Sequence, residues 1–93
     1  MVVHTAYKII VRGLVQGVYF RETARKEAYR LGIKGYVKNT DEECVEIVAV
    51  GPSDDIDEFV KWCHNGTEES RVDSVEVEII DIKTDFKDFI ILR

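Results

Sequence analysis

The chain carries, at residues 5–31, the stretch TAYKIIVRGLVQGVYFRETARKEAYRL, in which the spacing of apolar residues changes once. Apolar and polar residues alternate over residues 5–12, which predicts a β-strand. From residue 20 to residue 31 the apolar positions instead recur at i, i+4, i+8 and i+11, which is one stripe of an amphipathic helix. Glycines interrupt the residues between the two patterns, so the stretch predicts a strand, a loop and a helix in succession.

The rest of the chain predicts a similar order of elements. The expected elements are strands at residues 35–39 and 45–49 joined by a turn at 40–43, a helix ended by Gly66, a long strand at 72–82 and a short strand at 89–92. Gly51 and Pro52 are expected to break the strand that precedes the helix. Ser53 or Asp54 is expected to cap that helix.

The order of the elements indicates the fold class. Strand, helix, strand, strand, helix and strand, with one more strand at the end, predict an α+β fold. We expect a ferredoxin-like α/β sandwich, βαββαβ with an extra C-terminal strand, in which a mainly antiparallel sheet has both helices on one face. In the long strand, Val75, Val77 and Ile79 alternate with acidic residues and are expected to point toward the core. At 93 residues the chain is expected to form a single domain over residues 1–93.

The composition excludes several classes of protein. With 45% hydrophobic and 33% charged residues, the chain is neither disordered nor a collagen-like repeat. The net charge of −5 argues against a general nucleic-acid binder. The charge is uneven, because residues 1–38 hold eight Lys or Arg and two acids, whereas residues 39–93 hold five and sixteen. The basic first part suggests a small anionic ligand held at one place, although two solvated faces of opposite charge would give the same pattern.

The cysteines and the N-terminal segment suggest a cytoplasmic protein. Cys44 and Cys63 form no C-x-x-C pair and are expected to be reduced, with a disulfide between them as the alternative. No group of His, Cys, Asp or Glu has the spacing of metal ligands. The sequence shows neither a signal peptide nor an apolar run of the roughly 20 residues that span a membrane.

The glycine-spaced loop before the first helix is the best candidate for a ligand site. Gly13 and Gly17 allow the positive φ values with which a loop points several backbone amides at one place. Arg21 stands in the first turn of the helix, where a cation opposes the helix dipole. A phosphate held between the amides and Arg21 would explain this, because guanidinium donates two parallel hydrogen bonds to phosphate oxygens. The alternative is that Arg21 points into solvent or pairs with Glu22.

Asn39 is the second candidate, at the end of the predicted strand 35–39. A side-chain amide both donates and accepts hydrogen bonds without titrating, which suits it to hold a water molecule. The alternative, favoured when this position is taken alone, is an ordinary asparagine at the start of a turn.

Two motifs resemble those of a known family. The stretch VRGLVQGVYFR at residues 11–21 is similar to the acylphosphatase signature around its phosphate loop. The stretch GYVKN at residues 35–39, followed by Val45 and Gly51 at the expected distances, resembles a second signature of that family. The resemblance extends over nearly the whole chain, including the order of strands and helices.

The resemblance implies a hydrolase that cleaves the carboxyl–phosphate bond of acyl phosphates to a carboxylate and inorganic phosphate. By position, the family's catalytic arginine corresponds to Arg21 and its water-positioning asparagine to Asn39. The amides that bind phosphate correspond to Gln16, Gly17, Val18, Tyr19 and Phe20. No metal and no organic cofactor are implied. The expected partner is a small-molecule acyl phosphate, with no nucleic acid and no membrane, and the expected state is a monomer.

The chain departs from the family pattern in two turns. The family usually has Asp-Gly after the asparagine, where this chain has Glu42 and Glu43. Because glycine is the residue that adopts positive φ without strain, we expect this hairpin to use another turn or to be strained. Residues 66–70 stand where a Gly-Pro segment is common, and we expect that loop to be looser.

Three other interpretations remain open. The same fold and motif occur as a domain inside carbamoyl-transfer and hydrogenase-maturation proteins, which handle carbamoyl phosphate. A non-enzymatic RNA-recognition or regulatory module shares the sandwich, but the strand at residues 45–50 lacks the RNP-like aromatic run that RNA binding requires. A family member that has lost activity is disfavoured, because both Arg21 and Asn39 are present.

Overall fold

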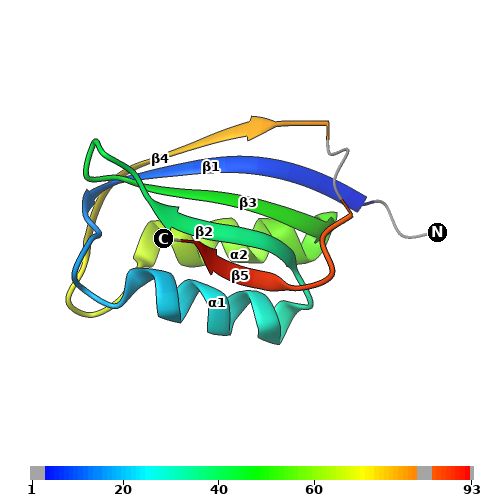
Figure 1. The fold of residues 1–93 in the computed structure, drawn as a ribbon, viewed down its shortest axis with the longest axis horizontal. Helices are drawn as coiled ribbons and strands as arrows, with labels where there is room; N and C mark the ends of the chain where they lie inside the picture. Colours follow the sequence, from blue (N-terminus) through cyan, green and yellow to red (C-terminus); the bar gives the residue numbers. More distant parts are fainter. Residues whose placement is uncertain (1–3, 82–84, 93) are drawn as a thin grey trace.

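The computed structural model describes residues 4–81 and 85–92. The elements in these ranges are β1 (His4–Leu14), α1 (Phe20–Leu31), β2 (Lys34–Asn39), β3 (Val45–Pro52), α2 (Ser53–Asn65), β4 (Arg71–Ile79) and β5 (Phe89–Leu92) (Figure 1). Their order confirms the predicted succession of strands and helices.

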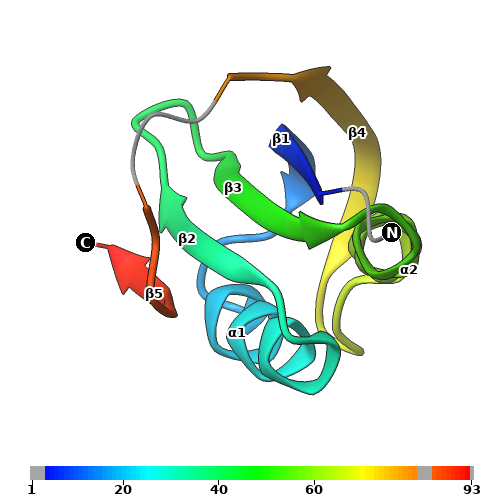
Figure 2. The same ribbon diagram turned by 90° about the vertical axis from the view of Figure 1, so that its right-hand side faces the viewer.

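The strands form one sheet in the order β4-β1-β3-β2-β5. Neighbouring strands are antiparallel except β2 and β5, which run parallel to each other. Both helices lie on the same side of the sheet, as Figure 2 shows. This arrangement confirms the predicted ferredoxin-like sandwich, with a mainly antiparallel sheet and two helices on one face.

The helix α1 has its predicted bounds because its apolar stripe is buried. Phe20, Ala24 and Ala28 face the core and are almost completely covered. Gly32 ends the helix in the left-handed conformation, with φ 71°, and its amide donates to the carbonyl oxygen of Tyr29. The predicted glycine cap is therefore confirmed.

The strand β3 is longer than predicted. The expected break at Gly51 and Pro52 is wrong, because β3 continues to Pro52 and pairs there with His4 of β1. On its other side β3 pairs with β2 only as far as Val50. Pro52 therefore has a neighbouring strand on one side only, which is a place where a strand tolerates proline.

The helix α2 begins directly after β3, without a side-chain cap. Pro52 holds the N-cap position with φ −60° and ψ 140°, so the extended backbone of the strand leads straight into the helix. The predicted cap at Ser53 or Asp54 is therefore wrong. Asp54 and Asp55 lie in the first turn, where their charges favour the helix dipole. Gly66 ends the helix, as predicted.

The strand β4 lies at the edge of the sheet and is only partly covered. It ends at Ile79, and residue 82, where the predicted strand ended, lies outside the described residues. Val75 packs against the core, as expected. Val77 is 44% exposed and Ile79 is 77% exposed, so the prediction that these two side chains lie in the core is wrong. Alternation assigns a residue to one face of a sheet, and it does not tell whether a helix covers that face at the edge.

The core lies between the sheet and the two helices. The ring centroid of Phe20 in α1 lies 5.0 Å from that of Trp62 in α2. Phe59 of α2 packs against Phe89 of β5, with 6.0 Å between the ring centroids. The buried Phe20 fixes the start of α1 and, with it, the end of the loop that precedes the helix.

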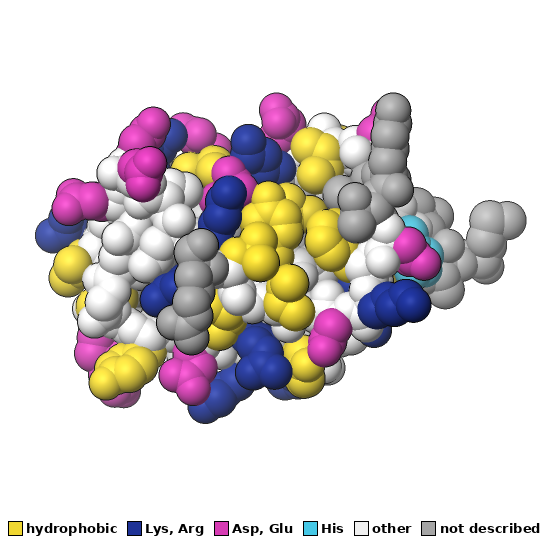
Figure 3. Space-filling view, viewed as in Figure 1, with side chains coloured by type: hydrophobic (Ala, Val, Ile, Leu, Met, Phe, Trp, Pro, Cys, Tyr) yellow, Lys and Arg dark blue, Asp and Glu magenta, His cyan; other side chains and the backbone are white. Residues whose placement is uncertain are grey.

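The face of the sheet opposite the helices mixes apolar and charged side chains. Figure 3 views this face, where hydrophobic side chains lie in the middle among Lys, Arg, Asp and Glu. Here the hydroxyl of Tyr36 donates to Glu46 at 2.8 Å. Partial burial and this bond to a carboxylate raise the pKa of Tyr36 to about 12.

The two cysteines are buried and free of disulfides, in agreement with the prediction. Among the described residues, no helix is both long and apolar enough to cross a membrane.

Candidate active site

Three connecting segments meet at one end of the sheet, on the left in Figure 1. They are the loop at residues 15–19 between β1 and α1, the turn at residues 40–44 between β2 and β3, and the segment at residues 66–70 before β4. The topology therefore places the two predicted motifs at the same end of the molecule.

The strand β1 reaches the loop through a bulge. Its register with β4 shifts between Arg12 and Gly13. Gly13 has φ 132°, and a Cβ atom at this position would lie 2.1 Å from the carbonyl oxygen of Arg71. Glycine alone fits such a close approach of two backbones, which confirms the predicted positive φ at Gly13; a part of Gly13 in an anion site stays a prediction.

The loop at residues 15–19 is anchored at both ends and turned by two left-handed residues. Val15 and Phe20 are buried in the core. Between them, Gly17 has φ 74° and Tyr19 has φ 62°. Glycine adopts this conformation freely, whereas a tyrosine is strained in it by about 1 kcal/mol. The side chain of Tyr19 is 70% exposed, so burial does not compensate for this strain.

The backbone amides of residues 16–20 are available to a ligand. Within the described ranges, none of these amides donates a hydrogen bond to another group of the protein. They lie at the start of α1, where the helix dipole places partial positive charge. Thr67 holds the loop in place, because its Oγ1 donates to the carbonyl oxygen of Val18 at 2.9 Å. Free amides around left-handed turns form a concave site for an anion.

Arg21 lies in the first turn of α1 and borders a cavity of about 540 Å³. The cavity is lined by Val15, Gly17, Tyr19, Phe20, Arg21, Glu22, Arg25 and Ile91. In the part of the chain that the structure describes, the guanidinium of Arg21 makes no ion pair and no hydrogen bond. Pairing with Glu22, one of the alternatives for Arg21, is therefore excluded. A cation that has no partner among residues 4–81 and 85–92 therefore lies beside the loop amides.

Asn39 ends β2, opposite Val45 of β3. Its Oδ1 atom is buried and accepts no hydrogen bond from the described residues. An unsatisfied buried acceptor costs about 1–3 kcal/mol, which a bound water molecule would recover by donating to it. Asn39 borders a second cavity, of about 430 Å³, together with Arg12 and Cys44.

The turn after Asn39 closes without a glycine. The amide of Thr40 donates to the carbonyl oxygen of Cys44 at 2.9 Å, and the amide of Cys44 donates to Oγ1 of Thr40 at 3.2 Å. Glu43 adopts the left-handed conformation with φ 63°. We expected that, with Glu42 and Glu43 in place of Asp-Gly, this hairpin would use another turn or be strained. The structure confirms strain, which lies at Glu43.

The segment at residues 66–70 is closed by hydrogen bonds, and its being looser than a Gly-Pro segment stays a prediction. The amide of Thr67 donates to Oγ of Ser70 at 2.8 Å, and that hydroxyl donates to the carbonyl oxygen of Thr67 at 2.9 Å. The amide of Ser70 donates to the same carbonyl oxygen at 3.1 Å. Side-chain hydroxyls thus close this turn without a proline.

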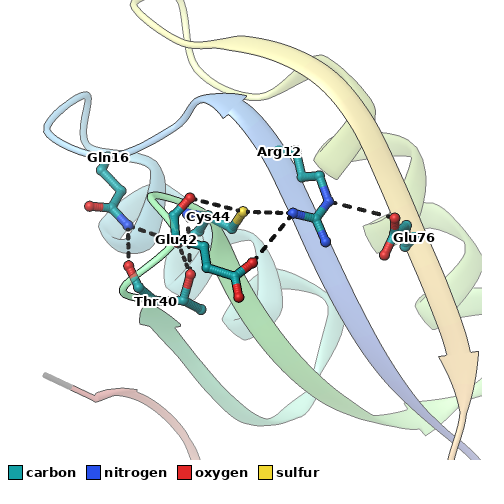
Figure 4. A network of polar contacts seen from close by, with 6 residues as sticks. All are labelled: Arg12, Gln16, Thr40, Glu42, Cys44 and Glu76. Carbon is teal, nitrogen blue, oxygen red and sulfur yellow. Dashed lines mark hydrogen bonds and ion pairs between the residues drawn. The ribbon is translucent and has the colours of Figure 1, made fainter.

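A polar network joins the loop to the turn, as Figure 4 shows. The side-chain Nε2 of Gln16 donates to the carbonyl oxygen of Thr40 at 3.0 Å and to that of Cys44 at 2.9 Å. These bonds connect residues 24 and 28 positions apart in the chain. The loop therefore lies against the turn that begins at Asn39.

Arg12 extends the network to the edge of the sheet. It donates to the Sγ atom of Cys44 at 3.3 Å. It also pairs with Glu42 at 3.8 Å and with Glu76 of β4 at 3.5 Å (Figure 4). The bond to Glu76, followed by the electrostatic effect of Cys44, raises the pKa of Arg12 above its usual value. Arg12 thus has several protein partners, whereas Arg21 has none in the part of the chain that the structure describes.

The predicted site residues are divided between the two cavities. The cavity beside the loop is lined by Gly17, Tyr19, Phe20 and Arg21 among others. Gln16 and Val18 belong to the same loop, but the side chain of Gln16 bonds to the turn and the carbonyl of Val18 to Thr67. Their amides remain for a ligand. Asn39 borders the other cavity, so the structure does not place it on one wall with Arg21.

Three contributions to the site were missed by sequence reasoning: the side-chain bonds of Gln16, the hydroxyl of Thr67, and Ile91. Ile91 borders the cavity of Arg21 because β5 pairs with β2, where it lies opposite Val37. Each of these contacts joins segments distant in sequence, and no local pattern signals them.

Comparison with known proteins assigns this site to a family. Residues 7–91 match the model of the acylphosphatase family, which is described as "Acylphosphatase". The chain belongs to the acylphosphatase family. Its activity is accordingly the hydrolysis of acyl phosphates.

The similarity to individual acylphosphatases extends along most of the chain. An acylphosphatase of Haloarcula marismortui is 45% identical over 78 residues, which are 84% of this chain and 86% of that relative. The crystal structure of acylphosphatase from Bacillus subtilis has a TM-score of 0.92 at 36% identity, and the match covers 98% of this chain and 100% of that one. Full-length HypF, solved in a phosphate- and nucleotide-bound form, gives a TM-score of 0.87 at 27% identity, covering 100% of this chain and 12% of HypF.

Proposed function

We propose that the chain hydrolyses acyl phosphates without a metal, that Arg21 and the amides of residues 16–20 bind the phosphate, and that Asn39 positions the water. The observation that carries the proposal is the guanidinium of Arg21, which has no partner among the described residues, beside amides at the start of α1 that likewise have none there. A cation there opposes the helix dipole by about 0.3–1 kcal/mol. A phosphate between the guanidinium and the amides turns this repulsion into attraction from both sides.

The chemistry needs positioning and charge stabilisation more than a strong base, because the carboxylate of an acyl phosphate is a good leaving group. In a loose transition state, negative charge spreads over the three outer oxygens of the phosphoryl group. The loop amides and Arg21 donate hydrogen bonds to these oxygens. The bond between phosphorus and the carboxylate oxygen breaks, the water oxygen bonds to phosphorus, and a proton of the water passes to a phosphate oxygen.

Asn39 supplies the acceptor that the attacking water needs. Its buried Oδ1 has no partner among the described residues and accepts a hydrogen bond from one O–H of the water. The bond orients the water so that its lone pair points at phosphorus, in line with the leaving carboxylate. Because an amide does not titrate, this role is independent of pH.

Steady-state hydrolysis of benzoyl phosphate in the presence of EDTA tests the proposal. Arg21→Ala is expected to lower kcat/KM by about 10²–10³-fold and to abolish competitive inhibition by inorganic phosphate. Asn39→Ala is expected to lower kcat by about 10²-fold with a smaller change in KM, because the phosphate cradle remains. Lys26→Ala removes a positive charge from the exposed side of the same helix and is the matched control, with kinetics expected to equal those of the wild type.

Two results would contradict the proposal. Wild-type kcat/KM in the Arg21→Ala variant would show that the phosphate is held elsewhere. Loss of wild-type turnover in EDTA, with recovery on addition of a divalent cation, would show that the reaction depends on a metal.

We also propose that residues 1–93 act as a single domain and as a monomer in the cytoplasm, on a small-molecule substrate without nucleic acid. The similarity to part of HypF shows that a domain of this fold also occurs within a much longer chain. Light scattering after size-exclusion chromatography tests the monomer, and a mass of twice 10.7 kDa would contradict it.

A further inference from the structure

One side chain connects the phosphate loop to the turn that begins at Asn39. Nε2 of Gln16 donates to the carbonyl oxygens of Thr40 at 3.0 Å and of Cys44 at 2.9 Å (Figure 4). Thr40 directly follows Asn39, and Cys44 directly precedes Val45, which is the strand partner of Asn39. The amide of Gln16 therefore holds both ends of the turn at once.

The chemistry of Gln16 matches this position. A primary amide has two N–H groups on one nitrogen, and here two carbonyl oxygens lie within hydrogen-bond distance of that nitrogen. The turn itself contains a strained residue, Glu43 with φ 63°, and is closed by bonds between Thr40 and Cys44 and by the bond from the Glu43 amide to the carbonyl oxygen of Thr40 at 3.2 Å. An additional clamp on the same two residues restricts how far the turn can move.

No other side chain of the loop makes such a connection. Within the described residues, the loop at 15–19 bonds to the turn at 40–44 only through Gln16. Arg12 also contacts the turn, but it extends from β1 and not from the loop. The strands and the buried Val15 and Phe20 set the position of the loop coarsely, and the two bonds of Gln16 add the direct contact that fixes the loop against the turn.

We propose that Gln16 is a positioning residue, which uses its side-chain amide to set the distance between the bound phosphate and the water held by Asn39. This role rests on the proposed function of Arg21 and Asn39. Without the clamp the loop amides and Arg21 still bind phosphate, so substrate affinity changes little. The water loses its alignment with the phosphorus atom, and a displacement of about 1 Å lowers the rate of an in-line reaction by up to 10²-fold.

Two variants of Gln16 separate positioning from a general loss of structure. Gln16→Met keeps the length of the side chain and removes the donors, and we expect kcat for benzoyl phosphate to fall about tenfold with KM changed less than about twofold. Gln16→Glu keeps the shape, but its carboxylate faces two carbonyl oxygens and donates nothing until it is protonated. We therefore expect its kcat, relative to wild type, to rise as the pH falls from 7 to 4, whereas the ratio for Gln16→Met stays constant.

The same kinetics in the Asn39→Ala background show whether Gln16 acts through Asn39. If it does, Gln16→Met reduces kcat much less in Asn39→Ala than in the wild type, because the water is already released. Equal losses in both backgrounds would overturn the positioning role and leave the proposed function intact. An unchanged kcat in Asn39→Ala itself would contradict the proposed function instead.

Thermal unfolding of each variant, followed by Trp62 fluorescence, corrects the rates for the folded fraction. An unchanged kcat per folded Gln16→Met molecule would overturn the inference, as would a raised KM at constant kcat. If Gln16→Met does not fold, the pH profile of Gln16→Glu decides, and a flat ratio to wild type overturns the positioning role.

Discussion

Replacing Glu43 by glycine should stabilise the protein although it removes a whole side chain. Glu43 is exposed in the turn between β2 and β3 and has φ 63°. The left-handed conformation costs a non-glycine residue about 1–2 kcal/mol, and it costs glycine nothing. Glycine loses about 0.5–1 kcal/mol more conformational free energy on folding than alanine does. The difference predicts a net increase of about 0.5–1 kcal/mol in the free energy of unfolding.

The matched control is Glu43→Ala, which removes the same charge and keeps the strained backbone. Its free energy of unfolding should stay within about 0.5 kcal/mol of the wild type. Urea unfolding followed by the fluorescence of Trp62, the single tryptophan, measures both variants. At an m value of about 1 kcal/mol/M, the midpoint of Glu43→Gly should lie about 0.5–1 M above that of the wild type. A glycine variant less stable than the alanine variant would refute the assignment of strain to Glu43.

Three further predictions concern the hydroxyl of Tyr36, the bulge at Gly13 and the loop contact of Thr67. The pKa of Tyr36 is raised to about 12 in the folded protein, so the neutral phenol stabilises the fold below pH 10. This contribution is about 1 kcal/mol after allowance for solvent screening, and it is lost as the pH rises from 10 to 12. Urea midpoints between pH 9 and 12 should therefore fall more steeply in the wild type than in Tyr36→Phe, and parallel curves would contradict this. Gly13→Ala should destabilise the fold by roughly 3 kcal/mol, because its Cβ would meet the carbonyl oxygen of Arg71 at 2.1 Å. A melting temperature equal to that of the wild type would contradict this, because it would show that the bulge relaxes freely. Thr67→Val loses the bond to Val18, so it should weaken inhibition by inorganic phosphate and lower the free energy of unfolding by about 1 kcal/mol. Thr67→Ser keeps the hydroxyl and should behave as the wild type.

Both helices could be predicted from the sequence because each has one apolar stripe and a terminal glycine. Phe20 begins α1 and Gly32 caps it, as local spacing indicates. The hairpin strain was also accessible, because Glu43 stands at a position where positive φ is required. Such features depend on residues close together in the chain, whose conformational preferences are independent of the rest of the fold.

The features that were missed depend on contacts between distant segments. The exposure of Val77 and Ile79 follows from the position of β4 at the sheet edge, which their alternation does not reveal. The side chain of Gln16 finds its partners on the turn 24 and 28 residues away. The hydroxyl of Thr67 finds its partner, the carbonyl oxygen of Val18, 49 residues away.

Binding of inorganic phosphate at the amides of the loop is the most direct test of the proposed mechanism. A titration followed by ¹⁵N–¹H NMR reports on every backbone amide separately. We predict that the amides of residues 16–20 shift together, with a single Kd equal to the competitive inhibition constant of phosphate, and that these shifts disappear in Arg21→Ala. Shifts confined to other residues, or loop shifts that persist unchanged in Arg21→Ala, would contradict a phosphate site built from these amides and Arg21.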